Sequence, residues 1–256
     1  MDDFSDAQIE RYARHLVMPE IGEEGQRRLM KARVLVVGAG GLGSPVLLYL
    51  AAAGIGTLGI IDDDQVDLSN LQRQVVHATP DVGRPKVESA QARLQAINPE
   101  VRVELHPLRL TPANALSIIS AYDIVADGSD NFATRYLVAD ACHLAGRTLV
   151  SAAMMRFEGQ ISVYRSHLGH GPDGTSNPCW RCLYPEQPEG NLKNSCADVG
   201  VLAMLPGVLG TLQATEVVKE ILGLGRSLAG RLLLYEGLEA RLSELRGKGE
   251  IVTKLF

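Results

Sequence analysis

The sequence predicts an α/β protein with a Rossmann-like, doubly wound, mainly parallel sheet that is extended by antiparallel strands and preceded by an N-terminal helical arm. Three observations favour this class. A β-branched apolar run at 33–37 leads directly into the glycine-rich turn 38–43. Short apolar runs then alternate with helical segments as far as residue 152. Finally, 256 residues that are 46% hydrophobic can bury the core of one large domain.

The arm and the first strands follow from local patterns. Ile9, Tyr12 and Leu16 recur at helical spacing, and Pro19 and Gly22 interrupt the pattern before a second short helix at 23–30. The next elements that we expect are a strand at 33–38, a helix at 42–53 and a strand at 57–62.

The same alternation continues to residue 152. We expect helices at 86–97, 112–119 and 132–145, and strands at 101–106, 123–126 and 148–152. Strands separated by helices imply right-handed crossovers and therefore parallel pairing.

The pattern changes after residue 152. We expect antiparallel strands at 159–165 and 231–235, a strand or a helix at 238–245, and an apolar helix at about 201–222 that Pro206 and Gly207 interrupt. A loop rich in Gly, Pro, Asn and Ser lies at 166–194, and we expect it to be mobile and to cover the site.

Composition limits the partners and the compartment. The chain has 25 Lys and Arg against 30 Asp and Glu and no long basic run, which disfavours a nucleic-acid partner. It shows no signal peptide and no stretch of about 20 apolar residues, which disfavours a membrane partner. Four cysteines in a chain of this length do not form a disulfide framework, and we therefore expect a cytoplasmic protein.

The glycine turn indicates a nucleotide. Gly38, Gly40 and Gly43 form a G-x-G-x-x-G motif between a strand and a helix, where backbone N–H groups can approach phosphate. Asp62 ends the following strand, where a carboxylate can accept hydrogen bonds from ribose hydroxyls. The alternative is a turn that serves only strand–helix packing.

Two cations distinguish a triphosphate from a dinucleotide. Arg73 and Lys86 follow the ribose-binding strand, and nucleotidyl transfer needs cations to neutralise the departing pyrophosphate. A nicotinamide-dependent oxidoreductase, the principal alternative, has no triphosphate to neutralise. The simpler interpretation of both residues is solvated surface charge.

The DGSDN segment at 127–131 follows another predicted strand at its carboxyl end. Asp130 is a candidate ligand for the Mg²⁺ that nucleotide phosphates carry. Its alternative role is to cap the helix that starts near Phe132.

Five spaced motifs together resemble a known family. RYARHL at 11–16, GAGGLG at 38–43, SNLQR at 69–73 with Asp62, GRPK at 83–86 and DGSDN at 127–131 are similar to the E1-like adenylyltransferases of the MoeB/ThiF (HesA) family. The resemblance covers nearly the whole chain. It implies a homodimeric enzyme that uses Mg·ATP to activate the C-terminal glycine of a ubiquitin-like sulfur-carrier protein ending in Gly-Gly, for molybdopterin or thiamine biosynthesis.

The resemblance also implies roles for individual residues. Arg14 would reach the ATP of the other subunit, and a persulfide-donating sulfurtransferase would supply sulfur to the acyl-adenylate. The helical arm would then be 1–31, the nucleotide-binding half 32–152 and the carrier-binding half 153–256. The nucleotide and metal residues would be Gly38, Gly40, Gly41, Gly43, Asp62, Ser69, Asn70, Leu71, Gln72, Arg73, Lys86, Asp130 and Asn131. A non-catalytic scaffold that binds the carrier is the remaining alternative.

The cysteines depart from the family pattern. Cys179 and Cys182 have the spacing of half a tetrahedral zinc site, which the family completes with a second C-x-x-C near the C-terminus, and residues 238–256 contain no cysteine. His167 and His170 are the alternative partners. Cys196 lies where some members carry a cysteine that forms a persulfide or an acyl-linked species, so we include it among the candidate catalytic residues. Cys142 is expected to pack in the core.

Overall fold

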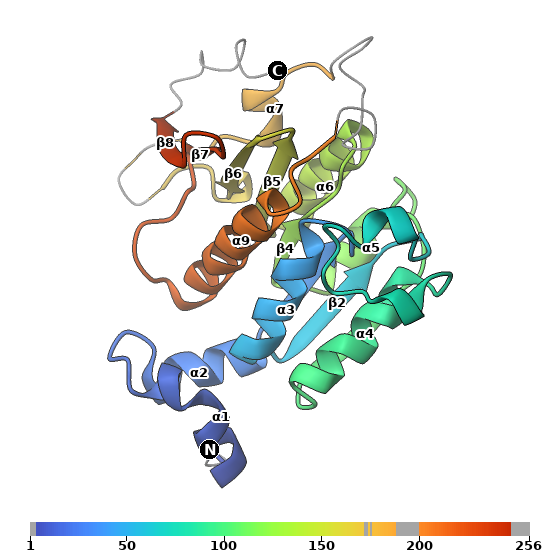
Figure 1. The fold of residues 1–256 in the computed structure, drawn as a ribbon. Helices are drawn as coiled ribbons and strands as arrows, with labels where there is room; N and C mark the ends of the chain where they lie inside the picture. Colours follow the sequence, from blue (N-terminus) through green and yellow to red (C-terminus); the bar gives the residue numbers. More distant parts are fainter. Residues whose placement is uncertain (1–3, 172–173, 175, 188–199, 247–256) are drawn as a thin grey trace.

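A computed structural model describes residues 4–171, 174, 176–187 and 200–246 (Figure 1). Within them, one eight-stranded sheet runs in the order β3-β2-β1-β4-β5-β6-β7-β8. The first five strands pair in parallel and the remaining pairs are antiparallel, which confirms the predicted class. The strands are β1 Arg33–Val37, β2 Thr57–Ile61, β3 Arg102–His106, β4 Ile124–Asp127, β5 Thr148–Met155, β6 Glu158–Tyr164, β7 Arg231–Glu236 and β8 Arg241–Arg246.

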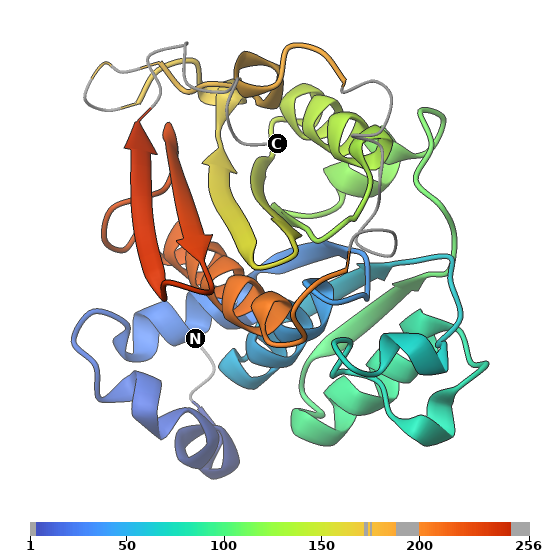
Figure 2. The ribbon, with the colours of Figure 1, turned by 45° about the horizontal axis from the view of Figure 1, so that its top comes forward.

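The helices occupy both faces of the sheet and the N-terminal arm. Figure 2 shows the sheet between its helical layers, with the arm, drawn in blue, at one end of the molecule. The helices are α1 Asp6–Leu16, α2 Gly22–Lys31, α3 Gly43–Ala53, α4 Lys86–Ile97, α5 Ala115–Ser120, α6 Phe132–Ala145, α7 Trp180–Leu183 and α9 Leu205–Leu222. None of the helices in the described part of the chain is both long and apolar enough to cross a membrane.

Alternating side chains of the strands build two cores. In β1, Val34 and Val36 pack with residues of α3, α4 and α9, whereas Leu35 and Val37 pack with residues of α5 and α6. This period of two is why the strand is apolar throughout, since both of its faces are covered. The covered parallel strands leave their carboxyl ends as the open edge at which a ligand can bind.

Two predicted elements need correction, and one open choice is resolved. Pro206 does not interrupt the apolar helix but lies in the first turn of α9, where a proline costs no hydrogen bond. Residues 241–246 form strand β8, which pairs with β7 and resolves the choice between strand and helix. The helix predicted from residue 112 begins at Ala115, because residues 112–114 form a turn.

A glycine lets α9 pack closely on α3. A Cβ atom at Gly210 would lie 2.4 Å from Pro45 Cγ and 2.6 Å from the carbonyl oxygen of Leu42. Gly207, one turn earlier in α9, has no atom within 4 Å of its Cβ position. The close approach therefore depends on Gly210 and not on glycine content in general.

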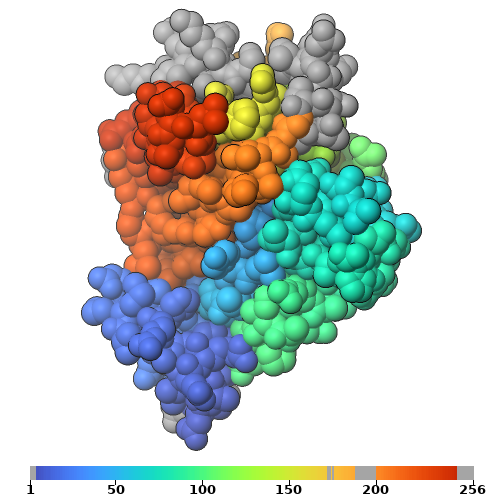
Figure 3. All heavy atoms as spheres, in the orientation of Figure 1, coloured from blue at the N-terminus to red at the C-terminus, as the bar shows by residue number. Residues whose placement is uncertain are grey.

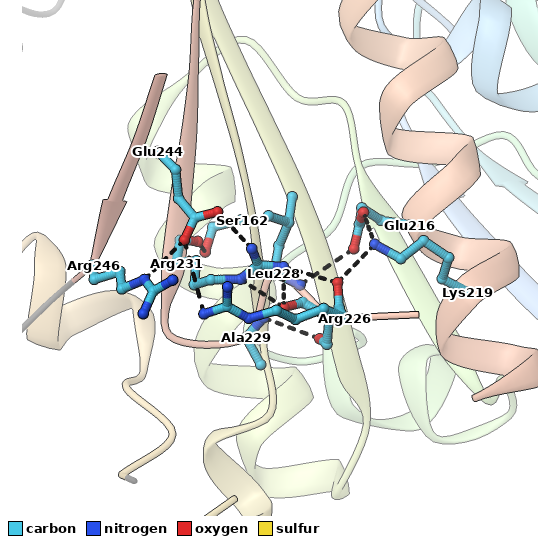
Figure 4. Close-up of polar contacts among 10 residues, drawn as sticks. Ser162, Glu216, Lys219, Arg226, Leu228, Ala229, Arg231, Glu244 and Arg246 are labelled. Atoms are coloured by element: carbon cyan, nitrogen blue, oxygen red, sulfur yellow. Dashed lines mark hydrogen bonds and ion pairs between the residues drawn. The ribbon is translucent and has the colours of Figure 1, made fainter. Parts of the chain in front are cut away.

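Polar contacts fix the other end of α9 (Figure 4). Glu216 accepts a hydrogen bond from the backbone N–H of Leu228 at 3.3 Å, and Arg231 donates to the carbonyl oxygen of Ser227 and pairs with Glu244 of β8. These contacts hold the connection between α9 and β7. As a result, the last two strands are tied to a helix of the core.

We predict that Gly210→Ala destabilises the protein by about 1–3 kcal/mol, because the added methyl group forces α3 and α9 apart. Gly207→Ala is the matched control on the same helix and should be neutral or stabilising by up to about 1 kcal/mol. Urea unfolding measures both. Equal effects of the two substitutions would contradict the close packing described here.

Candidate active site

Three glycines bring two strand ends together at the switch point of the sheet. The strand order reverses between β1 and β4, and the turns that follow these strands meet there. A Cβ atom at Gly43 would lie 1.8 Å from the carbonyl oxygen of Gly38, and one at Gly128 would lie 3.1 Å from the Gly43 nitrogen. Gly38 itself has a φ of +89°, which favours glycine. The Gly43 contact closes the turn itself, whereas a Cβ atom at Gly38 would lie 3.3 Å from the Gly128 carbonyl oxygen, so side chains at Gly38 and Gly128 would crowd the two backbones.

A cavity of about 500 Å³ opens at this switch point, a volume typical of small-ligand sites. Its walls come from the ends of neighbouring strands. They include Gly38, Gly40, Gly41, Asp62, Asp63, Asp64, Arg73, Lys86, Leu108, Arg109, Leu110, Gly128, Ser129, Asp130, Asn131, Arg135, Met154, Met155, Gln160, Trp180 and Tyr184. Gly38, Gly40, Gly41, Asp62, Arg73, Lys86, Asp130 and Asn131, which are predicted site residues, are thus brought to one cavity.

The glycine turn is clamped through the peptide groups on both sides of Ala39. Asp62 Oδ2 accepts a hydrogen bond from the Ala39 N–H at 2.8 Å. His77 Nε2 lies 2.9 Å from the Ala39 carbonyl oxygen, and His77 Nδ1 lies 2.8 Å from Ser89 Oγ. Because a carbonyl oxygen only accepts, Nε2 carries the proton and Nδ1 accepts from the Ser89 hydroxyl. His77, which sequence analysis missed, thus holds the glycine turn through the Ala39 carbonyl oxygen.

A cluster of acids and a buried lysine follow the second strand. Asp62, Asp63 and Asp64 place carboxylate oxygens within 4.8 Å of one another. The buried Lys86 side chain pairs with Asp64, with Nζ and Oδ2 2.8 Å apart. Burial raises the pKa of Asp62, whereas the charge of Lys86 acts to lower it. Cation and carboxylates therefore lie side by side on this wall of the cavity.

The DGSDN segment is held by its buried first residue. Asp127 accepts hydrogen bonds from the Ser129 N–H and from Ser151 Oγ, both at 3.0 Å. Asn131 caps α6 by accepting from the Thr134 N–H at 2.9 Å. The alternative role of Asp130 as the helix cap is therefore wrong, and its exposed carboxylate lies at the cavity.

Arg135 is a buried cation in the cavity wall that sequence analysis missed. Its guanidinium donates to the carbonyl oxygen of Ala152 at 2.9 Å and to that of Ser129. An arginine inside a helix is ordinarily a surface residue, so its type carries no signal. Residues 108–110 were also missed, although their place after the strand that pairs with β2 was a usable signal, because parallel strands end at the same edge.

Other predicted residues lie outside the cavity wall. Gly43 serves the close packing of the turn. The segment that contains Ser69, Asn70, Leu71 and Gln72 contacts the cavity residue Arg73 through backbone carbonyl oxygens. That of Ser69 accepts from Arg73 Nη1 at 3.3 Å, and that of Asn70 accepts from the Arg73 backbone N–H at 3.1 Å. The roles of these residues stay predictions.

Arg14 also lies outside the cavity wall. It is exposed on α1, in the N-terminal arm, so a role in the site of its own chain finds no support in this arrangement.

The cysteines do not gather a zinc site in the described part of the chain. Cys179 and Cys182 lie with their sulfur atoms 3.1 Å apart. Neither His167 nor His170 lies close enough to complete a site with them. Among the described residues, three or more metal-ligating side chains come together only at the acids 62–64. Cys142 of α6 packs in the hydrophobic core, as predicted. Cys196 lies outside the described residues.

Comparisons with known proteins identify the family that the chain resembles. A model of the ThiF family matches residues 12–250. The sulfur carrier protein adenylyltransferase of Thermus thermophilus is 52% identical over 238 residues, which are 93% of this chain and 87% of that protein. The probable adenylyltransferase/sulfurtransferase MoeZ of Mycobacterium tuberculosis is 53% identical over 91% of this chain, but the chain spans 58% of MoeZ.

Solved structures agree on the fold. The crystal structure of Escherichia coli MccB with MccA-N7isoASN superposes with a TM-score of 0.77 at 22% identity, over 98% of this chain and 75% of that chain. At this level of identity the likeness concerns the fold alone.

We predict that His77→Leu lowers the free energy of unfolding near neutral pH by about 1–3 kcal/mol, because it removes the hydrogen bond to the buried Ala39 carbonyl. His77→Gln keeps a donor toward Ala39 and should recover much of this loss. His143→Gln, at an exposed histidine outside the cavity, is the control and should stay within about 0.5 kcal/mol of the wild type.

The difference between the free energies of unfolding of wild type and His77→Leu depends on pH because His77 is buried. Burial lowers its pKa from the ordinary 6.5, so below that pH the unfolded chain binds more protons than the folded chain. The stabilising contribution of His77 is thus complete above 6.5 and is lost as the pH falls toward the lowered value. Urea unfolding across this range should show the gap between wild type and His77→Leu narrowing, and a gap that widens toward acid would be inconsistent with a neutral His77.

Proposed function

The chain belongs to the ThiF family, and we propose that its cavity transfers AMP from ATP to the C-terminal carboxylate of a ubiquitin-like sulfur-carrier protein. The observation that carries this proposal is a single cavity in which a glycine turn, a ribose-type acid and two cations meet. The chain also covers 87% of a relative that is named a sulfur carrier protein adenylyltransferase.

The proposed nucleotide positions follow from the chemistry of the wall. Backbone N–H groups of the glycine turn at the start of α3 favour phosphate, and Asp62 at the end of β2 is placed to accept from ribose hydroxyls. Asp62 already orders the glycine turn through Ala39. One carboxylate would therefore align the sugar and the phosphates with each other.

The proposed reaction needs no nucleophile from the protein. An oxygen of the carrier's terminal carboxylate attacks the α-phosphorus of ATP, the bond to the bridging oxygen breaks, and pyrophosphate leaves the acyl-adenylate. Lys86 and Arg73 would offset the negative charge that grows on the leaving group. Holding the carboxylate and the α-phosphate in line supplies the remaining rate enhancement.

The donor set also fits Mg²⁺. Asp130 is exposed at the cavity and the acids at 62–64 bring three carboxylates together, and oxygen ligands of this kind suit that ion. Bound with ATP, Mg²⁺ would neutralise phosphate charge. We assign Asp130 as its protein ligand. A nicotinamide-dependent oxidoreductase would have no triphosphate for Arg73 and Lys86 to neutralise, and a non-catalytic scaffold would not need the complete set of charged residues.

A homodimer would complete this site. Arg14 is exposed on α1, away from the wall of its own cavity, so reaching ATP requires a second subunit. On the face shown in Figure 3, the orange residues of α9 are open to the surface beside the blue and teal residues of the first half. Met204 and Val208 at the start of α9 are exposed apolar side chains. An apolar surface of this kind suits burial against a second copy.

The partners and the pathway remain part of the proposal. We assign the adenylate to a carrier for molybdopterin or thiamine biosynthesis in the cytoplasm, with sulfur supplied by a separate persulfide donor. The chain spans 58% of MoeZ, whose name includes a sulfurtransferase. We propose that the second half, 153–256, contacts the carrier.

The proposal predicts ATP–pyrophosphate exchange that depends on a carrier ending in Gly-Gly. Asp130→Asn, which removes the charge and keeps the shape, should lower the exchange rate by about 100-fold or more. Glu88→Gln, at an exposed carboxylate of α4 outside the cavity, should not change it. The absence of exchange with every carrier tested, in protein shown to be folded, would reject the function.

The shared site predicts complementation between subunits. Arg14→Ala and Asp130→Ala should each be inactive alone, whereas mixing and reassembling them should restore up to about a quarter of the wild-type exchange rate, because half of the subunits form heterodimers with one intact site. The rate is measured after co-refolding at equal amounts. Wild-type activity of Arg14→Ala alone, or no recovery in verified heterodimers, would place Arg14 outside the partner's site.

A further inference from the structure

Two thiols bracket a short helix beside the cavity. Cys179 precedes α7 and Cys182 lies within it, and their sulfur atoms are 3.1 Å apart. This distance exceeds the length of a disulfide bond, about 2.05 Å, by about 1 Å. Cys182 is exposed and Cys179 is half-buried, so a reagent in solution can reach the pair. A C-x-x-C pair in a reducing compartment is also the motif of thiol–disulfide exchange.

The zinc site that the family implies does not fit these residues. A closed tetrahedral site needs four ligands. Cys142 is buried in the core of α6, and no third metal-ligating side chain lies near Cys179 and Cys182 among the residues that the structure describes. No cysteine occurs after residue 196 in the sequence. Within the described part of the chain, the two thiols therefore have no third ligand and are available for chemistry with each other.

The residue between the thiols connects them to the cavity. Trp180 is buried, lines the cavity and packs on Tyr184 with ring centroids 4.5 Å apart. The Tyr184 hydroxyl accepts a hydrogen bond from Gln160 at 2.6 Å, and Gln160 lines the cavity as well. Any shift of α7 thus moves groups that line the cavity.

The outer side of α7 is held in place. Arg181 makes two hydrogen bonds to Asp140 of α6, at 2.9 and 2.7 Å. With this side anchored, drawing the two sulfur atoms together must be accommodated by the turn that carries Trp180. The movement of α7 on disulfide formation would therefore reach the residues that line the cavity.

We propose that Cys179 and Cys182 form a reversible dithiol–disulfide site whose state controls ligand binding in the cavity. The Cys182 thiolate attacks one sulfur of a small disulfide such as oxidised glutathione and releases the first thiol. Cys179 then attacks the Cys182 sulfur of the mixed disulfide and releases the second thiol. The protein loses two protons and two electrons, and the small disulfide accepts both. Burial raises the pKa of Cys179, which agrees with the exposed Cys182 acting first.

The first test concerns the bond itself and is independent of the proposed function. The full-length protein is equilibrated with reduced and oxidised glutathione, alkylated and digested. The mass of the peptide that contains both cysteines is then measured by mass spectrometry. We expect an internal disulfide that dithiothreitol reverses. Fluorescence of Trp180, the single tryptophan, should fall on oxidation. Cys182→Ser should abolish the change and Cys196→Ser should retain it. Failure of the disulfide to form, or stoichiometric zinc in protein purified without added metal, would overturn the proposal.

The second test concerns the cavity and rests on the proposed function. Affinities for ATP and for a synthetic peptide ending in Gly-Gly are measured by calorimetry on reduced and oxidised protein. At least one affinity should fall by about fivefold or more on oxidation, and Cys182→Ser should show no such fall. Equal affinities in both states would refute the control of the cavity. If neither ligand binds the reduced protein, the proposed function fails, and the first test still decides on the disulfide.

Discussion

The site depends on one constraint, which is that two backbones touch where side chains would normally stand. Gly43 lets the turn after β1 close on itself, since a methyl group there would lie 1.8 Å from the Gly38 carbonyl oxygen, and Gly38 and Gly128 let this turn lie against the segment after β4. This contact brings the glycine turn and the DGSDN segment to a common edge. The cavity lies where β1 and β4 continue into helices on opposite faces of the sheet, α3 and α6, which leaves a crevice between the two turns.

Most charged groups around this contact have two roles. Asp62 receives the Ala39 N–H and contributes to the acidic wall, and Lys86 neutralises Asp64 while lining the cavity. His77, neutral and buried, completes the clamp on Ala39. The wall is thus ordered before any ligand arrives, which reduces the reorganisation that binding a highly charged nucleotide would otherwise require.

The sequence was most informative where local chemistry repeats along the chain. The apolar strands, the glycine turn and the acids at strand ends could all be predicted, because parallel strands place their carboxyl ends together. Arg135 and Gln160 could not, since their burial depends on which helix and strand face each other. The start of α9 at Leu205 was also missed. A proline such as Pro206 is compatible with the first turn of a helix as well as with a break, and the pattern alone does not distinguish them.

The change of strand direction after β5 has an evolutionary consequence. Each parallel strand returns through a helix that belongs to a core, so a change in length there would disturb packing. From β5 to β6 and from β7 to β8 the chain reverses in tight hairpins, with left-handed residues at Arg156 and Ala240. Hairpin tips tolerate insertions. The tip at Ala240 lies outside the cavity wall, whereas β5 leads from Met154 and Met155, which line the cavity, directly into Arg156. Homologues can therefore diverge in loop length between β7 and β8 while the edge that carries the cavity stays unchanged.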